Sequence, residues 1–183
     1  MAGTWLLAID MQRIFAEPDS PWATPEFDRA KAGLDRLIPK FSGRVAFTRF
    51  LAPTNPSGAW VPYYRDWPFA LDPAHLDQYD LVAEYADIPA PIIDRPGFGK
   101  WDAAAASLLG MPEHLVVGGV STDCCVLSTV LAAIDAGVSV DVVSDASAGL
   151  SPADHQRALD AMGLYQPQVR VRTVEQVLDE LSA

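Results

Sequence analysis

Cysteine is scarce in this chain of 183 residues: there are two, Cys124 and Cys125, and they are neighbours. Vicinal cysteines are badly placed for an unstrained disulfide, because their side chains diverge in most backbone conformations. The sequence therefore excludes a scaffold held together by disulfides, and its cysteine content is typical of a reducing compartment.

Long apolar runs and basic side chains are also lacking. The first apolar run, residues 5–9, is shorter than the core of a signal peptide, which has about 7–15 residues. No run approaches the ~20 apolar residues of a membrane-spanning helix. Thirteen lysines and arginines against 24 aspartates and glutamates give a net charge of −11, which repels phosphate backbones and anionic lipid headgroups. We therefore expect a cytoplasmic protein that binds neither nucleic acid nor membranes.

Apolar residues are plentiful, since 50% of the chain is hydrophobic and 20% is charged. This composition excludes a disordered chain or a fibre and provides enough material for a packed core. Because a chain of this length suits one domain better than two, we expect a single domain over residues 1–183.

Short apolar runs alternate along the chain with segments of helical periodicity. Such alternation is typical of βαβ units, whose right-handed crossovers build a parallel sheet covered by helices on both faces. The sequence thus predicts a three-layer α/β sandwich with a mostly parallel sheet of five or six strands. We expect the strands at residues 4–9, 44–50, 115–120, 139–143 and 168–172, with one more ending at Ile93.

Capping residues mark where several helices begin. Thr24 and Pro25 are expected to cap the first long helix, and Ser151 with Pro152 opens a later one. The last helix starts at Thr173, which has a glutamine three residues on, the spacing of a capping box.

One region, residues 51–80, has no clear periodicity and holds several prolines and a cluster of four aromatic residues between 60 and 67. Loops of this length within a compact domain are uncommon and are often lids or binding walls. A proline-rich surface meander is an equally good interpretation of length alone. The aromatic residues favour a pocket wall, and Trp60 and Tyr64 are our candidates to line it.

Polar residues follow three of the predicted strands, at the edge of the sheet where ligands bind in open α/β folds. Asp10 follows the first strand, and a carboxylate there is costly to bury unless a partner neutralises it. Its alternative role is to cap the next segment. Arg95 and Lys100 follow the strand that ends at Ile93, and either cation could stabilise a carboxylate and a thiolate, or be an ordinary solvated charge.

The strand that ends at Val120 leads into the two cysteines. Paired glycines near its end allow close backbone approach, and Thr122 is a candidate N-cap for the next helix. Cys124 and Cys125 then fall in the first helical turn, where the helix dipole lowers thiol pKa values and free N–H groups can hold an oxyanion. The alternative is a pair of small core residues.

Residues 119–126, Gly-Val-Ser-Thr-Asp-Cys-Cys-Val, together with the strand ending in Asp-Met-Gln at 10–12, resemble the isochorismatase-like cysteine hydrolase family. The resemblance covers nearly the whole chain and implies that family's Rossmann-like α/β fold. It implies that Cys125 is the nucleophile, with Cys124 as a packing neighbour. It also implies a cis peptide between Val120 and Ser121, and an oxyanion hole made by the N–H groups of Ser121 and Cys125.

The resemblance implies a catalytic triad of aspartate, lysine and cysteine, in which Asp10 and Cys125 match the outer members. The family lysine comes six residues before an aromatic residue at a helix start. Counting back from Trp101 gives Arg95, whereas Lys100 has the expected residue type five places later. We favour Arg95 as the positional equivalent and keep Lys100 as the rival.

Metal and cofactor chemistry find no support in the sequence. Nicotinamidase-type relatives carry an Asp-x-His pair just after the second strand, and residues 48–53 contain neither ligand. His75, His114 and His155 are isolated and are interpreted as structural or solvated. The glycine patterns of dinucleotide- and ATP-binding loops are also lacking. We expect no metal and no cofactor.

The residues and the resemblance together predict a metal-independent cysteine hydrolase that cleaves a C–N bond of a small amide, carbamoyl or ureido compound through a thioester. Phe15 joins the candidate pocket wall by its family position. Two alternatives stay open: acid hydrolysis of a vinyl ether by Asp10, and an inactive member that serves as a binding or scaffold subunit. The resemblance also implies a homo-oligomer, a dimer or a tetramer.

Overall fold

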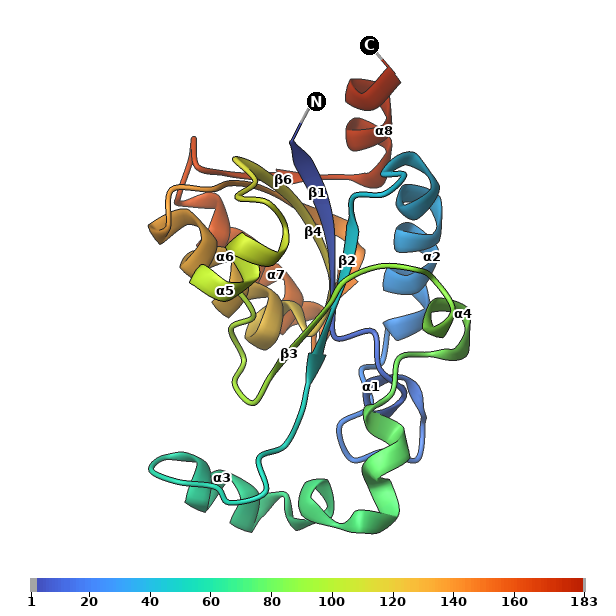
Figure 1. The fold of residues 1–183 in the computed structure, drawn as a ribbon, viewed down its shortest axis with the longest axis vertical. Helices are drawn as coiled ribbons and strands as arrows, with labels where there is room; N and C mark the ends of the chain where they lie inside the picture. The colour runs from blue at the N-terminus through green and yellow to red at the C-terminus, as the bar shows by residue number, and fades with distance from the viewer. Residues whose placement is uncertain (1–2, 183) are drawn as a thin grey trace.

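The protein is built around one parallel sheet of six strands in the order β3-β2-β1-β4-β5-β6 (Figure 1). The structure, a computed structural model, describes residues 3–182. All six expected strands form, with the bounds β1 Thr4–Ile9, β2 Val45–Phe50, β3 Ile92–Arg95, β4 His114–Val120, β5 Ser139–Ala148 and β6 Val169–Arg172.

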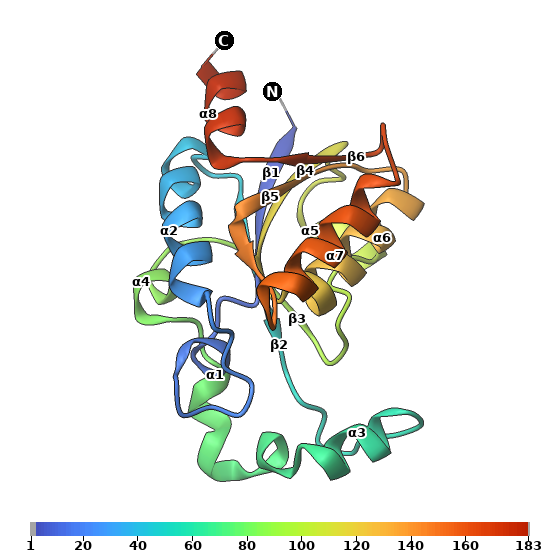
Figure 2. The same cartoon turned by 180° about the vertical axis from the view of Figure 1, so that it is seen from behind.

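Helices cover both faces of this sheet (Figures 1 and 2). On one face lie α2 (Phe27–Leu37), α4 (Ala83–Ala86) and α8 (Val174–Ser182), and on the other lie α5 (Ala103–Leu108), α6 (Leu127–Asp135) and α7 (Pro152–Gly163). Each face has its own apolar core, in which Leu34 and Val177 pack on one side and Val130 and Met162 on the other. The predicted three-layer α/β fold with a parallel sheet is confirmed.

The expected caps form at two of the three helix starts. The Ser151 hydroxyl accepts a hydrogen bond from the Asp154 N–H at α7, and at α8 the Thr173 N–H donates to the Gln176 side chain in a capping box. The expectation for Thr24 is wrong, because α2 starts at Phe27 with Glu26 as its N-cap residue. The Thr24 hydroxyl therefore caps no helix.

Residues 51–80 are more regular than expected. They contain α3 (Trp60–Asp66) and two 3₁₀ segments, Pro68–Leu71 and Pro73–Tyr79. Prolines open both 3₁₀ segments, which explains why no helical periodicity is visible in the sequence. This stretch extends beyond the carboxyl ends of the strands, where α3 lies below the sheet in Figure 1. A short helix, α1 (Arg13–Ala16), lies at the same end.

Two glycines let β4 approach its neighbours closely where it ends. A Cβ atom at Gly118 would lie 2.7 Å from the Ala146 carbonyl oxygen, and one at Gly119, whose φ is +121°, would lie 2.1 Å from that of Ile9. The pairing of β4 with β5 shifts register here as well. Only glycine fits these positions, and as a result the end of β4 lies directly beside the residue before Asp10.

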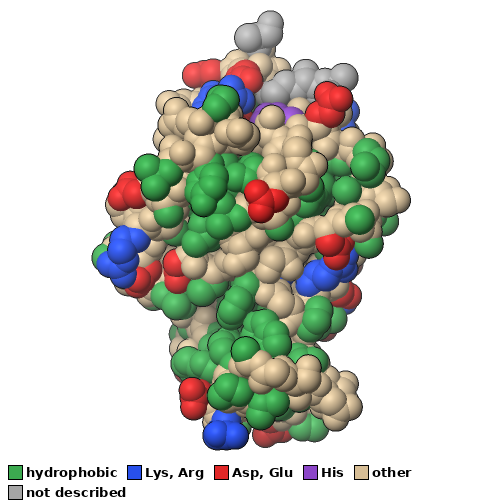
Figure 3. All heavy atoms as spheres, turned by 90° about the vertical axis from the view of Figure 1, so that its left-hand side faces the viewer, with side chains coloured by type: hydrophobic (Ala, Val, Ile, Leu, Met, Phe, Trp, Pro, Cys, Tyr) green, Lys and Arg blue, Asp and Glu red, His purple; other side chains and the backbone are tan. Residues whose placement is uncertain are grey.

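The side of the molecule that carries α5 and α6 is shown in Figure 3, where hydrophobic side chains are spread among few charges. The homo-oligomer implied by the resemblance stays a prediction.

None of the helices formed by residues 3–182 combines the length and the apolar character needed to cross a membrane.

Candidate active site

Asp10 lies at the end of β1 and is completely buried. Its φ of +50° is uncommon for a residue other than glycine, and aspartate is among the side chains that tolerate it. The Thr48 hydroxyl accepts a hydrogen bond from the Asp10 N–H at 3.1 Å and donates one to its carboxylate oxygen Oδ1. Burial of this carboxylate requires a partner of opposite charge, and the structure supplies one.

Lys100 is that partner. Its Nζ lies 3.1 Å from Oδ2 of Asp10, and both side chains are 0% exposed. The ammonium group also donates a hydrogen bond to the Gly97 carbonyl oxygen at 2.6 Å and lies 5.0 Å from the centre of the Phe50 ring. A fully buried ion pair is stable only when both charges are present, so neither residue can be removed alone without a large cost.

Arg95 does not reach this site, and the preference for it as the neighbour of Asp10 is wrong. Its guanidinium forms two hydrogen bonds of 2.8 Å to the Asp102 carboxylate. Asp102 in turn accepts a hydrogen bond from the Ala105 N–H and caps α5. The segment from 96 to 100 folds back toward β1, which brings Lys100 to Asp10 although it follows the strand end by five residues.

Cys125 faces Asp10 and Lys100 from the turn after β4. The peptide between Val120 and Ser121 is cis, as expected. One turn of π-helix, Thr122–Val126, carries both cysteines and continues into α6. Thr122 is the first residue of this turn and not its cap, and its hydroxyl pairs with Nδ1 of His155 at 2.8 Å.

Thr129 of α6 connects the cysteine to the lysine. Its hydroxyl donates a hydrogen bond to the Cys125 carbonyl oxygen at 2.6 Å and accepts one from the Lys100 N–H at 3.0 Å. One side chain thus fixes the backbone at both residues. The sequence gives no sign of this role, because a threonine in a helix is usually unremarkable.

The pKa of the Cys125 thiol is raised, contrary to the expectation from the helix terminus. Burial raises its pKa well above the ordinary value, the negative charge of Asp10 raises it further, and Lys100 opposes these effects only in part. The side chain is 4% exposed, so solvent does little to stabilise a thiolate. The raised pKa favours the protonated thiol, and the Asp10 carboxylate lies beside it.

This protonation state predicts slow alkylation near neutral pH. In a Cys124→Ala protein, where Cys125 is the single thiol, we expect iodoacetamide to react more slowly than with glutathione at pH 7.5. The rate should rise about tenfold per pH unit through pH 9, because only the thiolate attacks and its pKa is raised. Intact mass measured over time gives the rate. Fast alkylation that does not change between pH 6 and pH 9 would contradict the prediction.

The predicted oxyanion hole lies in the turn that carries the cysteines. The Ser121 N–H finds no hydrogen-bond acceptor within residues 3–182, and the Ser121 side chain lines the same cavity as Cys125. Free backbone donors beside a nucleophile are suited to hold a developing negative charge on oxygen. Use of the N–H groups of Ser121 and Cys125 in this way stays a prediction.

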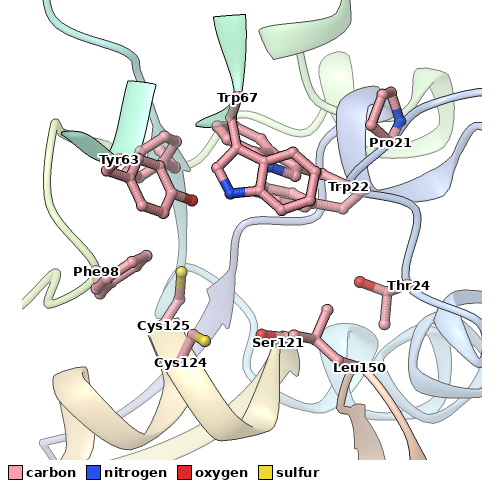
Figure 4. A pocket seen from close by; sticks show the side chains of 12 residues that line it. Pro21, Trp22, Thr24, Tyr63, Trp67, Phe98, Ser121, Cys124, Cys125 and Leu150 are labelled. Carbon is pink, nitrogen blue, oxygen red and sulfur yellow. The ribbon is translucent and has the colours of Figure 1, made fainter. Parts of the chain in front are cut away.

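A cavity of about 220 Å³ opens above Cys125 (Figure 4). Phe15 lines the cavity, as expected. The prediction that Trp60 and Tyr64 line it is wrong. Trp60 packs behind the wall on Phe98, with ring centres 5.0 Å apart, and Tyr64 is buried beside it. Tyr63 of α3 and Trp67, which directly follows this helix, line the cavity instead. Trp22, Phe50 and Phe98 line it as well, and none of these five residues was among the predicted wall residues.

Cys124 also lines the cavity and is not only a packing neighbour. Its sulfur lies 3.7 Å from Oδ2 of Asp123, and burial followed by the Asp123 charge raises the pKa of this thiol too. Both sulfurs are visible at the floor of the cavity in Figure 4. Only Cys125 has the buried ion pair beneath it, and this difference separates the two thiols chemically.

The residues present do not fit a metal. The segment after β2 is Leu51-Ala52-Pro53, which offers no carboxylate or imidazole, and no group of three potential ligands converges within residues 3–182. The three histidines lie elsewhere: His155 pairs with Thr122, His75 with Gln78, and His114 with Thr4 and Asp141.

Comparison with solved structures finds the same fold in several hydrolases. A cysteine hydrolase from Pseudomonas syringae pv. phaseolicola superposes with a TM-score of 0.86 at 18% identity, covering 98% of this chain and 92% of that one. A pyrazinamidase from Pyrococcus horikoshii, solved in complex with zinc, gives 0.75 at 25% identity, covering 93% and 99%. An N-carbamoylsarcosine amidase from Thermoplasma acidophilum gives 0.72 at 19% identity, covering 93% and 96%.

No curated protein matches the sequence. The family model described as the isochorismatase domain, in contrast, matches residues 4–176. That match covers nearly all of the chain, including Asp10, Lys100 and Cys125. The protein therefore belongs to the isochorismatase family and is a hydrolase of that α/β fold.

Proposed function

We propose that this chain is a cysteine hydrolase that cleaves a C–N bond of a small, neutral amide, carbamoyl or ureido compound through a thioester, without a metal. The observation that carries the proposal is the fully buried ion pair of Asp10 and Lys100 beside Cys125, beneath an apolar cavity. A buried base, a fixed positive charge and a thiol in contact with a ligand cavity are the parts that nucleophilic catalysis requires.

In the first half of the reaction, Sγ of Cys125 forms a bond to the substrate carbonyl carbon while its proton passes to the Asp10 carboxylate. The π electrons of the carbonyl move to its oxygen, which the N–H groups of Ser121 and Cys125 hold. When this intermediate collapses, the C–N bond breaks and the nitrogen takes the proton from Asp10. Ammonia or an amine leaves, and a thioester remains.

The second half returns the enzyme to its starting state. A water molecule gives one proton to Asp10 as its oxygen bonds to the thioester carbon. The C–S bond then breaks, and the Cys125 sulfur takes the proton back from Asp10. The positive charge of Lys100, 3.1 Å from Asp10, stabilises the Asp10 carboxylate whenever that group is ionised.

The walls of the cavity favour a neutral substrate. None of the described residues that line it carries a formal charge, and Asp10 and Lys100 already neutralise each other beneath it. A carboxylate on the substrate would lose its hydration on entering the cavity and would find no positively charged side chain to pair with, which is costly. The names of the amidases with the same fold support the C–N class. Vinyl-ether hydrolysis by Asp10 would leave Cys125 without a role, and no observation favours it.

The experiment that tests the proposal is a screen for ammonia release from three neutral classes: primary amides, N-carbamoyl amines and ureas. We expect turnover of at least one class, and intact mass should reveal the acyl group on the protein during turnover. A matched amide that differs only by an added carboxylate should react at least tenfold more slowly. Prior alkylation of Cys125 should stop all turnover. Ammonia release from none of the classes, or release that survives alkylation, would contradict the proposal.

A further inference from the structure

Thr24 lines the cavity, and its buried hydroxyl has no hydrogen-bond partner among residues 3–182. Thr24 is 4% exposed, and its Oγ1 is buried with no donor or acceptor in range among residues 3–182. Figure 4 shows this oxygen pointing into the cavity from the side opposite Phe98, with the cysteines on the floor between them. Leaving a buried hydroxyl unpaired is costly, so its position calls for a ligand that pairs with it.

The backbone around Thr24 holds the hydroxyl in this place. The Thr24 N–H donates a hydrogen bond to the Phe15 carbonyl oxygen at 2.8 Å, and its own carbonyl accepts one from the Phe27 N–H at 3.1 Å. The helix start uses Glu26 as its N-cap residue, so capping does not explain the threonine. A rigid segment thus presents a polar group to an otherwise apolar wall.

The other walls are flat. Trp22 stacks with Phe15 at an interplanar angle of 12°, and its ring centre lies 6.0 Å from Tyr63 and 6.2 Å from Trp67. Aromatic faces favour flat, unsaturated ligands that stack against them. A cavity of roughly 150 Å³ holds a benzene molecule. The 220 Å³ found here therefore holds one ring with an amide-sized substituent.

We propose that Thr24 is a specificity-determining residue, and that the substrate is a neutral carboxamide on a single flat ring with a hydroxyl or carbonyl at the edge opposite the amide. The inference builds on the proposed function, since it places the amide carbon at Cys125 and the polar edge at Thr24. The threonine hydroxyl can donate to or accept from such a group. Thr24 touches no reacting atom, and its effect is on binding.

The test uses benzamide and 4-hydroxybenzamide as probes of the Cys125→Ala protein, which cannot turn them over. Quenching of tryptophan fluorescence gives the two dissociation constants, because Trp22 and Trp67 line the cavity. We expect 4-hydroxybenzamide to bind at least tenfold more tightly. Adding Thr24→Val, which has the same shape without the hydroxyl, should remove this difference, and Thr24→Ser should keep most of it.

In the enzyme with Cys125 intact, Thr24→Val should raise KM for 4-hydroxybenzamide about tenfold with little change in kcat, and raise KM for benzamide much less. Equal binding of the two probes, binding of neither, or a preference that survives Thr24→Val would overturn the inference. The two proposals can fail separately: preferential binding without ammonia release contradicts the proposed chemistry alone, and turnover without preference contradicts the role of Thr24 alone.

Discussion

Cys125→Ala is expected to abolish hydrolysis, lowering kcat by at least about 10⁴-fold. In the proposed mechanism the sulfur is the one atom of the site that forms a bond to the substrate, and alanine leaves Asp10 with no proton to take from a nucleophile. The oxyanion donors are backbone groups and survive the change, so a small residual activity above the uncatalysed rate is compatible with the mechanism. The measurement is ammonia release under saturating substrate.

Cys124→Ala is the matched control, because it removes a thiol one residue away that lines the same cavity. We expect it to retain kcat within a fewfold, since Cys124 has no buried ion pair beneath it. Both variants should melt within a few degrees of the parent, because each removes one small side chain. If Cys125→Ala is as active as the parent, the vinyl-ether or the scaffold alternative replaces the thioester mechanism.

The centre of the sheet could be predicted from the sequence because β1 and β4 are short, mostly apolar runs bounded by turn residues. The run before Asp10 and the one before Ser121 are buried on both faces, which leaves no ambiguity about their place in the sheet. Residues 51–80 could not be predicted as well. Their short helices are set by packing of aromatic side chains, and local periodicity does not show it.

The aromatic wall illustrates what the sequence leaves open. Four aromatic residues between 60 and 67 predict a binding wall. They form two pairs at spacing i, i+4, which lie on different faces of a helix, and the sequence does not tell which pair faces the cavity. The structure turns Tyr63 and Trp67 to the cavity and Trp60 and Tyr64 away from it. Trp22 carries no local signal at all, since it reaches the cavity through a segment without regular structure.

The cation and the thiol pKa were mispredicted for related reasons. Counting residues from Trp101 assumes that the loop runs straight from the strand end, and the chain instead folds back so that Lys100 reaches Asp10. A helix terminus lowers a thiol pKa at the surface, whereas at Cys125 burial outweighs it. The cation beside Asp10 and the pKa of Cys125 both depend on which groups are buried together, and this cannot be derived from the order of residues in the chain.

Lys100→Met is expected to lower kcat by at least about 10²-fold, and Arg95→Met to leave it within twofold. Removing Lys100 leaves the Asp10 carboxylate buried and unpaired, a change that typically costs about 3–5 kcal/mol of stability. Arg95 pairs with Asp102 in a partly exposed position, where an ion pair contributes about 1 kcal/mol or less. Arg95→Met should therefore unfold close to the parent in urea, and Lys100→Met at a clearly lower concentration.

The double variant Asp10→Asn with Lys100→Met separates catalysis from stability. With both charges removed, no uncompensated carboxylate remains, so the urea midpoint should recover most of the loss seen in Lys100→Met. Activity should stay absent, because the base and its counter-charge are both gone. Recovery of activity along with stability would mean that Lys100 acts only on folding. Loss of activity in Arg95→Met, with Lys100→Met still active, would instead show that Arg95 is the catalytic cation.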